Sequence, residues 1–250
     1  MNEQIEGRAR MLGASAVSVL SVQSLKAKSA RLHEQVTAML PSASSVVSFA
    51  AAFPKGAIHV LKDPEKGLPY YTRIAGIGAR MVDEISTRLA LVFEEEGFSA
   101  VPIFVCTPLE MKARFDLRGH VPQVELAALS GLGWIGKNGL LMTERNGPRI
   151  GVGTVLTDAP LPEKRCTAIE HCPDDCYICV EKCPARALDG SGRVERLACT
   201  AVQAIAPLSL LMIKEFPAKE FRDMVLNVGA VDEHTWYRCN ACVVQCPVGI

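Results

Sequence analysis

The sequence predicts an α/β fold in which helices and strands alternate, followed by a smaller cysteine-rich module. Over the first 160 residues, segments with helical periodicity alternate with short apolar runs that are typical of buried strands. Nine of the ten cysteines lie in the last 85 residues. We therefore expect a first domain over residues 1–160 and a second over residues 161–250.

Periodicity and turn residues locate the elements of the first domain. Helices are predicted at residues 3–13, 29–40, 70–97 and 122–130, and strands at residues 16–22, 44–53, 100–106, 139–143 and 149–157. Ser29 is a suitable N-cap, Pro122 suits the start of a helix, and Gly97 suits the position after a helix end.

Two segments between these elements are predicted to be irregular, and one turn is predicted to be a hairpin. Residues 54–69 are rich in Gly, Pro and charge, and the chain is irregular from residue 107 to Gly119. The pair Asn146–Gly147 favours a hairpin that joins the last two strands.

Charge and hydropathy argue against a nucleic-acid-binding, secreted or membrane-spanning protein. The chain has 27 basic and 27 acidic residues, so a nucleic-acid partner is unlikely on charge alone. The N-terminus MNEQIEGRAR has no apolar stretch of a signal peptide, and the longest apolar runs are too short to cross a bilayer. We expect a cytoplasmic protein without a membrane partner.

The cysteines form two similar motifs. HCPDDCYICVEKCP and YRCNACVVQCP each end in C-x2-C-x3-C-P. A reducing cytosol disfavours disulfides, so the motifs indicate metal binding. The spacing is the core of the bacterial ferredoxin motif, in which the cysteine before proline binds the other cluster.

Applied to this chain, the motif predicts two 4Fe–4S clusters. Cluster I takes Cys172, Cys176, Cys179 and Cys246, and cluster II takes Cys183, Cys199, Cys239 and Cys242. The spacing Cys172-x3-Cys176 has one residue more than usual, so Cys166 is a reserve ligand. Two four-cysteine zinc sites are the alternative. Cys106 lies in an apolar run and is predicted to be a buried small side chain.

The stretch GLGWIGKN (131–138) has the glycine spacing of a dinucleotide-binding turn. Such a turn needs a strand before it and a helix after it. Here a predicted helix precedes the glycines and a predicted strand follows them, so a nicotinamide site is not expected. We expect the glycines to let the loop pack closely over something flat.

One further observation is a family resemblance. PQVELAALSGLGWIGKNGLLMT, followed by VLTDAPL and the cysteine motifs, resembles the epoxyqueuosine reductases and the wider group that includes corrinoid-dependent reductive dehalogenases. SASSVVSFAAAFP and LPYYTR occur in the order expected of that group. The family typically continues into helical repeats that handle tRNA. Only three residues follow Pro247 here, so we expect a shorter relative.

The resemblance implies a nitroreductase-like α/β domain that binds cobalamin, followed by a ferredoxin-like module with two 4Fe–4S clusters. It makes five residues of the glycine-rich stretch candidates for cofactor binding: Gly133, Trp134, Gly136, Lys137 and Asn138. Lys137 and Asn138 would bond the polar arms of the corrinoid, and Trp134 would pack beside it.

Candidate catalytic residues lie at the start of the long helix. Epoxyqueuosine reductases carry an acidic proton donor there in a G-R-D-Y-H-like stretch, whereas this chain reads YYTRIAGIGARM, without Asp or His. Tyr70, Tyr71 and Arg73 are the candidates instead, because a tyrosine beside an arginine can donate a proton, its phenol pKa lowered by the cation. Alternatively, both tyrosines only pack on the core.

The resemblance and the motifs together predict an iron–sulfur oxidoreductase. Electrons would pass from two clusters to a corrinoid, which would remove oxygen or halogen from a small or nucleoside-like substrate. The alternative is a non-catalytic electron carrier or a reductase of a corrinoid protein. The expected partners are an electron donor such as ferredoxin or flavodoxin, and either a small-molecule substrate or a corrinoid protein.

Overall fold

The computed structural model describes residues 2–104, 109–113, 116–119, 121–167, 171–205, 236–237 and 239–249. The elements are α1 (Asn2–Met11), β1 (Ala16–Ser21), α2 (Val22–Lys28), α3 (Ala30–Met39), β2 (Ser45–Ala52), α4 (Ala57–Leu61), α5 (Gly67–Glu95), β3 (Ala100–Ile103), β4 (Leu109–Ala113), β5 (Asp116–Gly119), α6 (Gln123–Leu129), β6 (Trp134–Ile135), β7 (Leu141–Met142), β8 (Ile150–Thr157), α7 (Ile178–Glu181), α8 (Arg196–Gln203), β9 (Ala204–Ile205), β10 (Trp236–Tyr237) and α10 (Ala241–Val244).

A four-stranded antiparallel sheet organises the first part of the chain. Its order is β1-β2-β8-β3, so β2 and β8 are the central strands. Along β2, Val47 lies opposite Val19 on one side and opposite Val155 on the other. The predicted α/β class is confirmed, with an antiparallel sheet.

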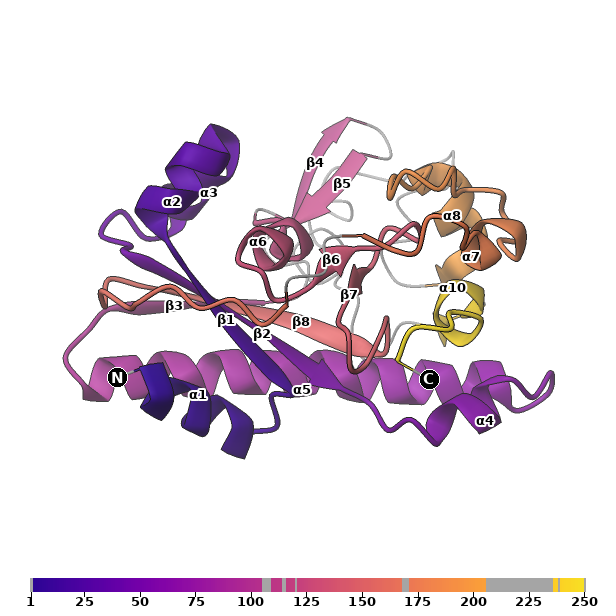
Figure 1. Cartoon of the computed structure of the whole chain (residues 1–250), viewed down its shortest axis with the longest axis horizontal. Coiled ribbons are helices and arrows are strands. Elements are labelled where there is room, and N and C mark those ends of the chain that lie inside the picture. The colour runs from indigo at the N-terminus through magenta and orange to yellow at the C-terminus, as the bar shows by residue number, and fades with distance from the viewer. Residues whose placement is uncertain are drawn as a thin grey trace, which may run out of the picture.

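The two faces of the sheet are covered by different helices. Figure 1 shows α5 running along one face with α1 beside it, whereas α6 lies on the opposite face. Phe49 of β2, together with Ile85 and Leu89 of α5, belongs to the core on the α5 side. The ring of Phe49 lies over its cross-strand partner Gly153, where an added Cβ would meet the ring at 2.1 Å.

Several predicted boundaries agree with the structure. The Ser29 hydroxyl accepts a hydrogen bond from the backbone N–H of Leu32, 3.3 Å away, and caps α3. The long helix α5 ends just before Gly97, which has a φ of +86°. Both local predictions are confirmed, because each depends on a residue type that satisfies the end of a helix.

Three predictions about irregular segments and pairing are wrong. The expected loop at 54–69 contains the short helix α4 and the first turn of α5, and the expected irregular stretch before Gly119 contains the paired strands β4 and β5. The turn at Asn146–Gly147 does form, but β7 pairs with β6 and β8 enters the central sheet. The residues of β8 from Gly153 to Thr157 are all buried, so burial between β2 and β3 decides its partners.

The cysteine motifs lie at one end of this core. Figure 1 shows α7, α8 and α10 grouped near the N-terminal half of α5 and the β6–β7 ribbon. Strand β10 pairs with β9 and contacts α5. Among the described residues, none of the helices combines the length and hydrophobicity that a bilayer crossing requires.

Candidate functional site

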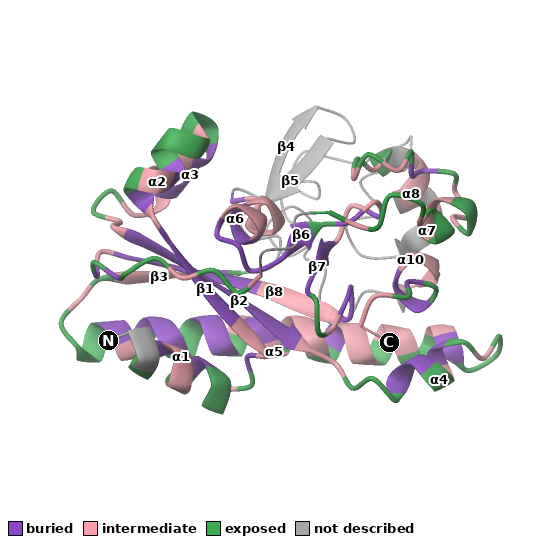
Figure 2. Ribbon diagram, in the orientation of Figure 1, coloured by how far each residue is buried: buried purple, intermediate pink, exposed green. Residues whose placement is uncertain are grey.

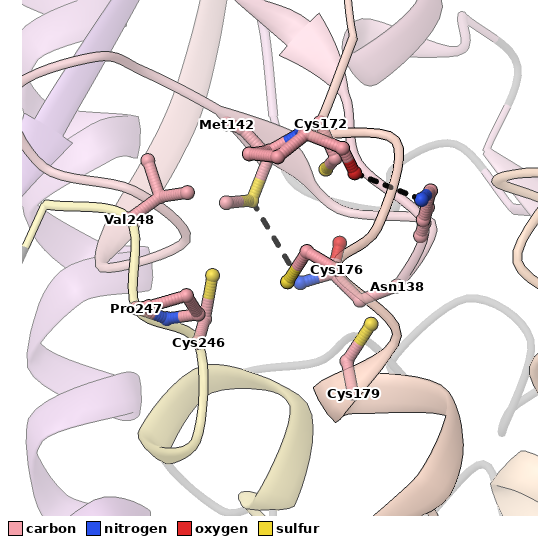
Figure 3. A pocket seen from close by; sticks show the side chains of 10 residues that line it. Asn138, Met142, Cys172, Cys176, Cys179, Cys246, Pro247 and Val248 are labelled. Carbon is pink, nitrogen blue, oxygen red and sulfur yellow. Dashed lines mark hydrogen bonds between the residues drawn. The ribbon is translucent and has the colours of Figure 1, made fainter.

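Four cysteine side chains surround one pocket at the junction between the two cysteine motifs (Figure 3). Three come from the first motif, and Cys246 comes from the second. The enclosed cavity volume at this point is about 10 Å³. The lining residues are Lys137, Asn138, Met142, Cys172, Pro173, Cys176, Cys179, Cys246, Pro247 and Val248. The structure thus brings together the four side chains that the spacing assigns to cluster I.

The remaining four motif cysteines form a second group. The pKa of Cys242 is raised to about 12, mainly by burial and then by the nearby thiols of Cys239 and Cys199. Burial also raises the pKa of Cys199, and the next contributions come from Cys183 and Cys239. These mutual effects place Cys183, Cys199, Cys239 and Cys242 near one another. Their assignment as metal ligands stays a prediction.

Each group of four thus contains one cysteine from the other motif, and short helices account for this exchange. In each motif the middle cysteine lies on a four-residue helix, Cys179 on α7 and Cys242 on α10. The third cysteine follows the helix and precedes a proline, which cannot donate a backbone hydrogen bond. Because α7 and α10 contact each other, Cys246 reaches the first pocket, whereas Cys183 lies with the second group.

The sequence leaves two kinds of metal centre open, zinc and iron–sulfur. A zinc site needs its four ligands within about 2.0–2.3 Å of one ion. Among the residues that the structure describes, no group of three or more His, Cys, Asp or Glu side chains is arranged to hold a single ion. Thiols spread around a pocket suit a cubane better, because irons and sulfides lie between its ligands.

The protonation of the pocket thiols also depends on what the pocket holds. The pKa of Cys246 is raised to about 11, mainly by burial, and the other three thiols of the pocket act in the same direction. A bound metal reverses this direction, since coordination deprotonates a thiol. The four thiols are therefore a donor set that suits a metal centre.

Lys137 connects the glycine-rich loop to the first cysteine motif. Its Nζ donates hydrogen bonds to the carbonyl oxygens of Pro173 and Asp174, at 2.9 and 2.8 Å. The same ammonium lies 3.9 Å from the centre of the Tyr177 ring. These contacts hold the segment between Cys172 and Cys179.

Asn138 connects the same loop to the second motif. Its Nδ2 donates to the carbonyl oxygen of Cys242, 3.2 Å away, and its Oδ1 accepts from the N–H of Leu140 at 3.1 Å. Only 4% of Asn138 is exposed. Two consecutive residues thus contact the two motifs separately, a role that sequence reasoning missed.

The glycines of this loop allow close packing within the protein. A Cβ on Gly133 would lie 2.0 Å from the carbonyl oxygen of Met142, and one on Gly136 would lie 2.7 Å from Asn138 Oδ1. Trp134 is buried and packs with Met142 and Cys246. The loop therefore packs on its own ribbon and on the cysteine segments, and corrinoid binding by these five residues stays a prediction.

Arg149 is a second residue that sequence reasoning missed. It is buried, and burial lowers its pKa. Its Nη1 donates to the carbonyl oxygen of Phe53 at 2.8 Å, and its Nη2 donates to that of Gly249 at 2.6 Å. Arg149 thereby fixes the segment after Cys246 to the central sheet. This role depends on contacts with residues far away in the sequence, so no local sequence pattern predicts it.

The candidate catalytic residues lie in different environments. The Tyr71 ring meets the Tyr237 ring edge-on, with centroids 5.1 Å apart. Burial, then Tyr237 and the thiols of Cys242 and Cys239, raise the pKa of Tyr71. The expected lowering by Arg73 is therefore wrong for Tyr71. Tyr70 and Arg73 are exposed on the outer surface of α5, and their catalytic role stays a prediction.

Two further cysteines were considered from the sequence. The thiol of Cys166 donates to the carbonyl oxygen of Val17 at 2.7 Å, and Cys172, not Cys166, lines the pocket. Cys106 lies outside the described residues.

The amino-acid sequence was compared with those of known proteins. No family model matches the chain. Epoxyqueuosine reductase from Bacillus cereus is 26% identical over 209 residues, which are 84% of this chain and 49% of that protein. The Staphylococcus aureus enzyme of the same name is 28% identical over 213 residues, covering 83% of this chain and 49% of that protein. The chain is thus similar in sequence to epoxyqueuosine reductases over most of its length. It spans about half the length of these curated relatives.

Solved structures agree with this relationship at the level of fold. The epoxyqueuosine reductase of Streptococcus thermophilus has a TM-score of 0.64 at 21% identity, covering 100% of this chain and 66% of that one. An epoxyqueuosine reductase with a tRNA stem loop has a TM-score of 0.62 at 20% identity, covering 99% and 65%. A reductive dehalogenase with 3-bromo-4-hydroxybenzoic acid has a TM-score of 0.51 at 17% identity, covering 75% and 25%. The resemblance to epoxyqueuosine reductases and dehalogenases is confirmed.

Proposed function

We propose that this protein is an iron–sulfur oxidoreductase that holds two 4Fe–4S clusters. Cys172, Cys176, Cys179 and Cys246 would hold the first, and Cys183, Cys199, Cys239 and Cys242 the second. The observation that carries the proposal is the position of Cys246, which joins three thiols of the other motif around one pocket. That exchange is the arrangement of two-cluster ferredoxins.

The protein environment suits electron transfer. A 4Fe–4S cluster supplies or accepts one electron at a time. Met142 and Val248 are apolar side chains that line the first pocket, and Trp134 packs with Met142. The thiol of Cys179 also acts on the pKa of Cys242, so the two groups of cysteines are neighbours. Electrons would therefore cross a short distance between the clusters.

We propose that the protein catalyses a reductive reaction, because the similar proteins are epoxyqueuosine reductases and a reductive dehalogenase. Removal of an epoxide oxygen as water consumes two electrons and two protons, and replacement of halogen by hydrogen consumes two electrons and one proton while releasing halide. Two clusters together hold the two electrons that either reaction needs. Because one relative holds a tRNA stem loop, a nucleic-acid substrate is included beside small and nucleoside-like molecules.

A corrinoid cofactor is part of the proposal only through the relatives. When bound, it would supply a low-potential cobalt centre to the substrate. However, the residues that the resemblance assigns to it do not offer a cradle, because Lys137 and Asn138 use their polar atoms within the protein and Trp134 is buried. The same observation favours the second candidate function, an electron carrier without its own corrinoid.

The test of the proposal is metal content and spectroscopy of the anaerobically purified protein. We expect about eight iron atoms per chain and a broad absorbance near about 400 nm that dithionite bleaches. Cys246→Ser should remove the cluster held mainly by the first motif, and Cys183→Ser should remove the other, each with about half the iron. Stoichiometric zinc without iron would overturn the proposal.

A separate titration tests the corrinoid. Cob(II)alamin is added to the loaded protein, and its EPR spectrum is compared with that of free cob(II)alamin. A change to the base-off form supports a bound corrinoid. An unchanged spectrum assigns the protein to the carrier class and leaves the cluster proposal intact.

A further inference from the structure

One outer face of α5 combines apolar and cationic side chains. Tyr70, Arg73, Ile77 and Arg80 follow one another at helical spacing, and all four are exposed. Tyr70 is 41% exposed and Ile77 is 45% exposed, which is unusual for side chains of this size. Arg73 and Arg80 line a shallow hollow that also includes Ile77. We call these four residues the α5 face.

The charge of this segment has one sign. Between Gly67 and Val82 the only charged residues are Arg73 and Arg80, and Lys66 before them is paired with Asp63. The first acidic residue after this segment is Asp83. A surface that combines exposed apolar side chains with arginine is typical of a site that binds another protein.

The α5 face lies one layer of residues away from the second group of cysteines. Thr72 lines the same hollow, and its hydroxyl accepts a hydrogen bond from the N–H of Tyr237 at 3.0 Å. The hydroxyl also donates to the carbonyl oxygen of Tyr237 at 3.4 Å. Tyr237 stands two residues before Cys239 and packs against Tyr71. The hollow is therefore connected to Cys239 by one hydrogen-bonded residue.

We propose that the α5 face is the docking surface for an acidic one-electron carrier protein that reduces the cluster held by Cys183, Cys199, Cys239 and Cys242. This inference rests on the proposed function. The reduced carrier loses one electron, and the oxidised cluster gains it, without transfer of a proton. Charge complementarity selects the occupant, because a cationic face attracts an acidic partner and steers the encounter.

The size of the face agrees with such a partner. Complexes between redox proteins are among the smallest specific interfaces, because they must form and separate quickly. A face of four side chains along one helix supplies only a few strong contacts, so electrostatic attraction contributes most of the association. The association should therefore weaken with salt, which screens charges over about 10 Å at 0.1 M.

The experiment compares two reductants on the iron-loaded protein. Reduced plant-type 2Fe–2S ferredoxin, an acidic carrier, and dithionite are each mixed with the parent protein, and bleaching of the cluster absorbance is followed by stopped flow. Arg73→Glu should slow reduction by ferredoxin about tenfold at low ionic strength, with a smaller salt dependence, and should leave reduction by dithionite unchanged. Lys26→Glu is the matched control, since Lys26 is an exposed cation on α2 and the charge change is the same.

A second variant guards against misfolding. Ile77→Glu adds a negative charge to the same face and should give the same selective loss, even if Arg73→Glu fails to bind iron. The inference is overturned if ferredoxin reduces both variants as fast as the parent, or if Lys26→Glu has the same effect. It is also overturned if dithionite reduces the parent and ferredoxin does not. A parent without iron would instead contradict the proposed function.

Discussion

In the central sheet, Val47, Phe49 and Val155 are completely buried and belong to one continuous core with α5. In the described residues from 171 to 205 and from 239 to 249, the buried side chains are few: Ala187, Leu188, Val243, Val244 and Cys246. Figure 2 shows this contrast between the purple sheet and the pink and green cysteine region. The sheet is stabilised by its own apolar contacts, whereas the cysteine region has little core of its own. We therefore expect this region to depend on the proposed metal and on the loop that contacts it.

The largest expected effect comes from removing iron. Chelation of the proposed clusters should speed hydrogen exchange of backbone amides in residues 171–205 and 239–249 by orders of magnitude, because metal binding supplies much of their folding free energy. Amides of β2 and β8 should keep their protection. Exchange measured by mass spectrometry, with and without iron, checks this. Equal protection of the cysteine region in both states would contradict the comparison.

A substitution in the core of the central sheet should instead destabilise the sheet. Phe49→Ala removes a completely buried ring and should lower the free energy of unfolding by about 3–5 kcal/mol. Urea unfolding followed by circular dichroism measures the loss. Leu91→Ala is the control, since Leu91 is 52% exposed and its loss should cost less than about 0.5 kcal/mol. Similar effects of the two substitutions would show that the sheet is not packed as described.

A smaller effect is expected at the connection between the two regions. Asn138→Ala removes the hydrogen bond to the carbonyl oxygen of Cys242 and should cost about 1–2 kcal/mol locally. Iron release to a chelator should become several-fold faster, while the urea midpoint of the sheet changes little. Gln23→Ala, at an exposed position of α2, serves as the control. An unchanged rate of iron release would mean that the contact does not support the cysteine region.

The smallest effect concerns pH and the N-terminal helix. The hydrogen bond from Lys164 lowers the pKa of Glu6 below its ordinary value of 4.5, and Arg10 acts in the same direction against burial. Because the folded pKa is lower than the unfolded one, the contribution of Glu6 is present above about pH 4.5 and is lost as the pH falls through the folded pKa. Glu6→Gln should therefore cost a few tenths of a kcal/mol at neutral pH. The difference from the parent should narrow in acid, as measured by urea midpoints at both pH values.

Local patterns predicted the features that depend on neighbouring residues. Ser29 caps its helix and Gly97 follows the end of α5, because each residue acts within one turn. The grouping of Cys246 with the first motif follows from the motif spacing, and the structure has the same grouping. Ligation of metal by these thiols stays a prediction.

Contacts between distant segments were not predictable in this way. Lys137 and Asn138 contact residues 36 and 104 positions away, and Arg149 contacts Gly249, 100 positions away. The turn at Asn146–Gly147 was identified correctly, but burial selected the partners of β8. Turn chemistry acts locally, whereas strand pairing depends on the whole core.

The central position of β8 has a consequence for synthesis on the ribosome. Strand β2 is synthesised by Ala52, but β8, which pairs with both β2 and β3, is complete only at Thr157. At about 5–20 residues per second, roughly 5–20 s pass before the sheet can close. During this interval the hydrogen-bonding edge of an apolar strand is open, which makes the nascent chain a natural client for chaperones.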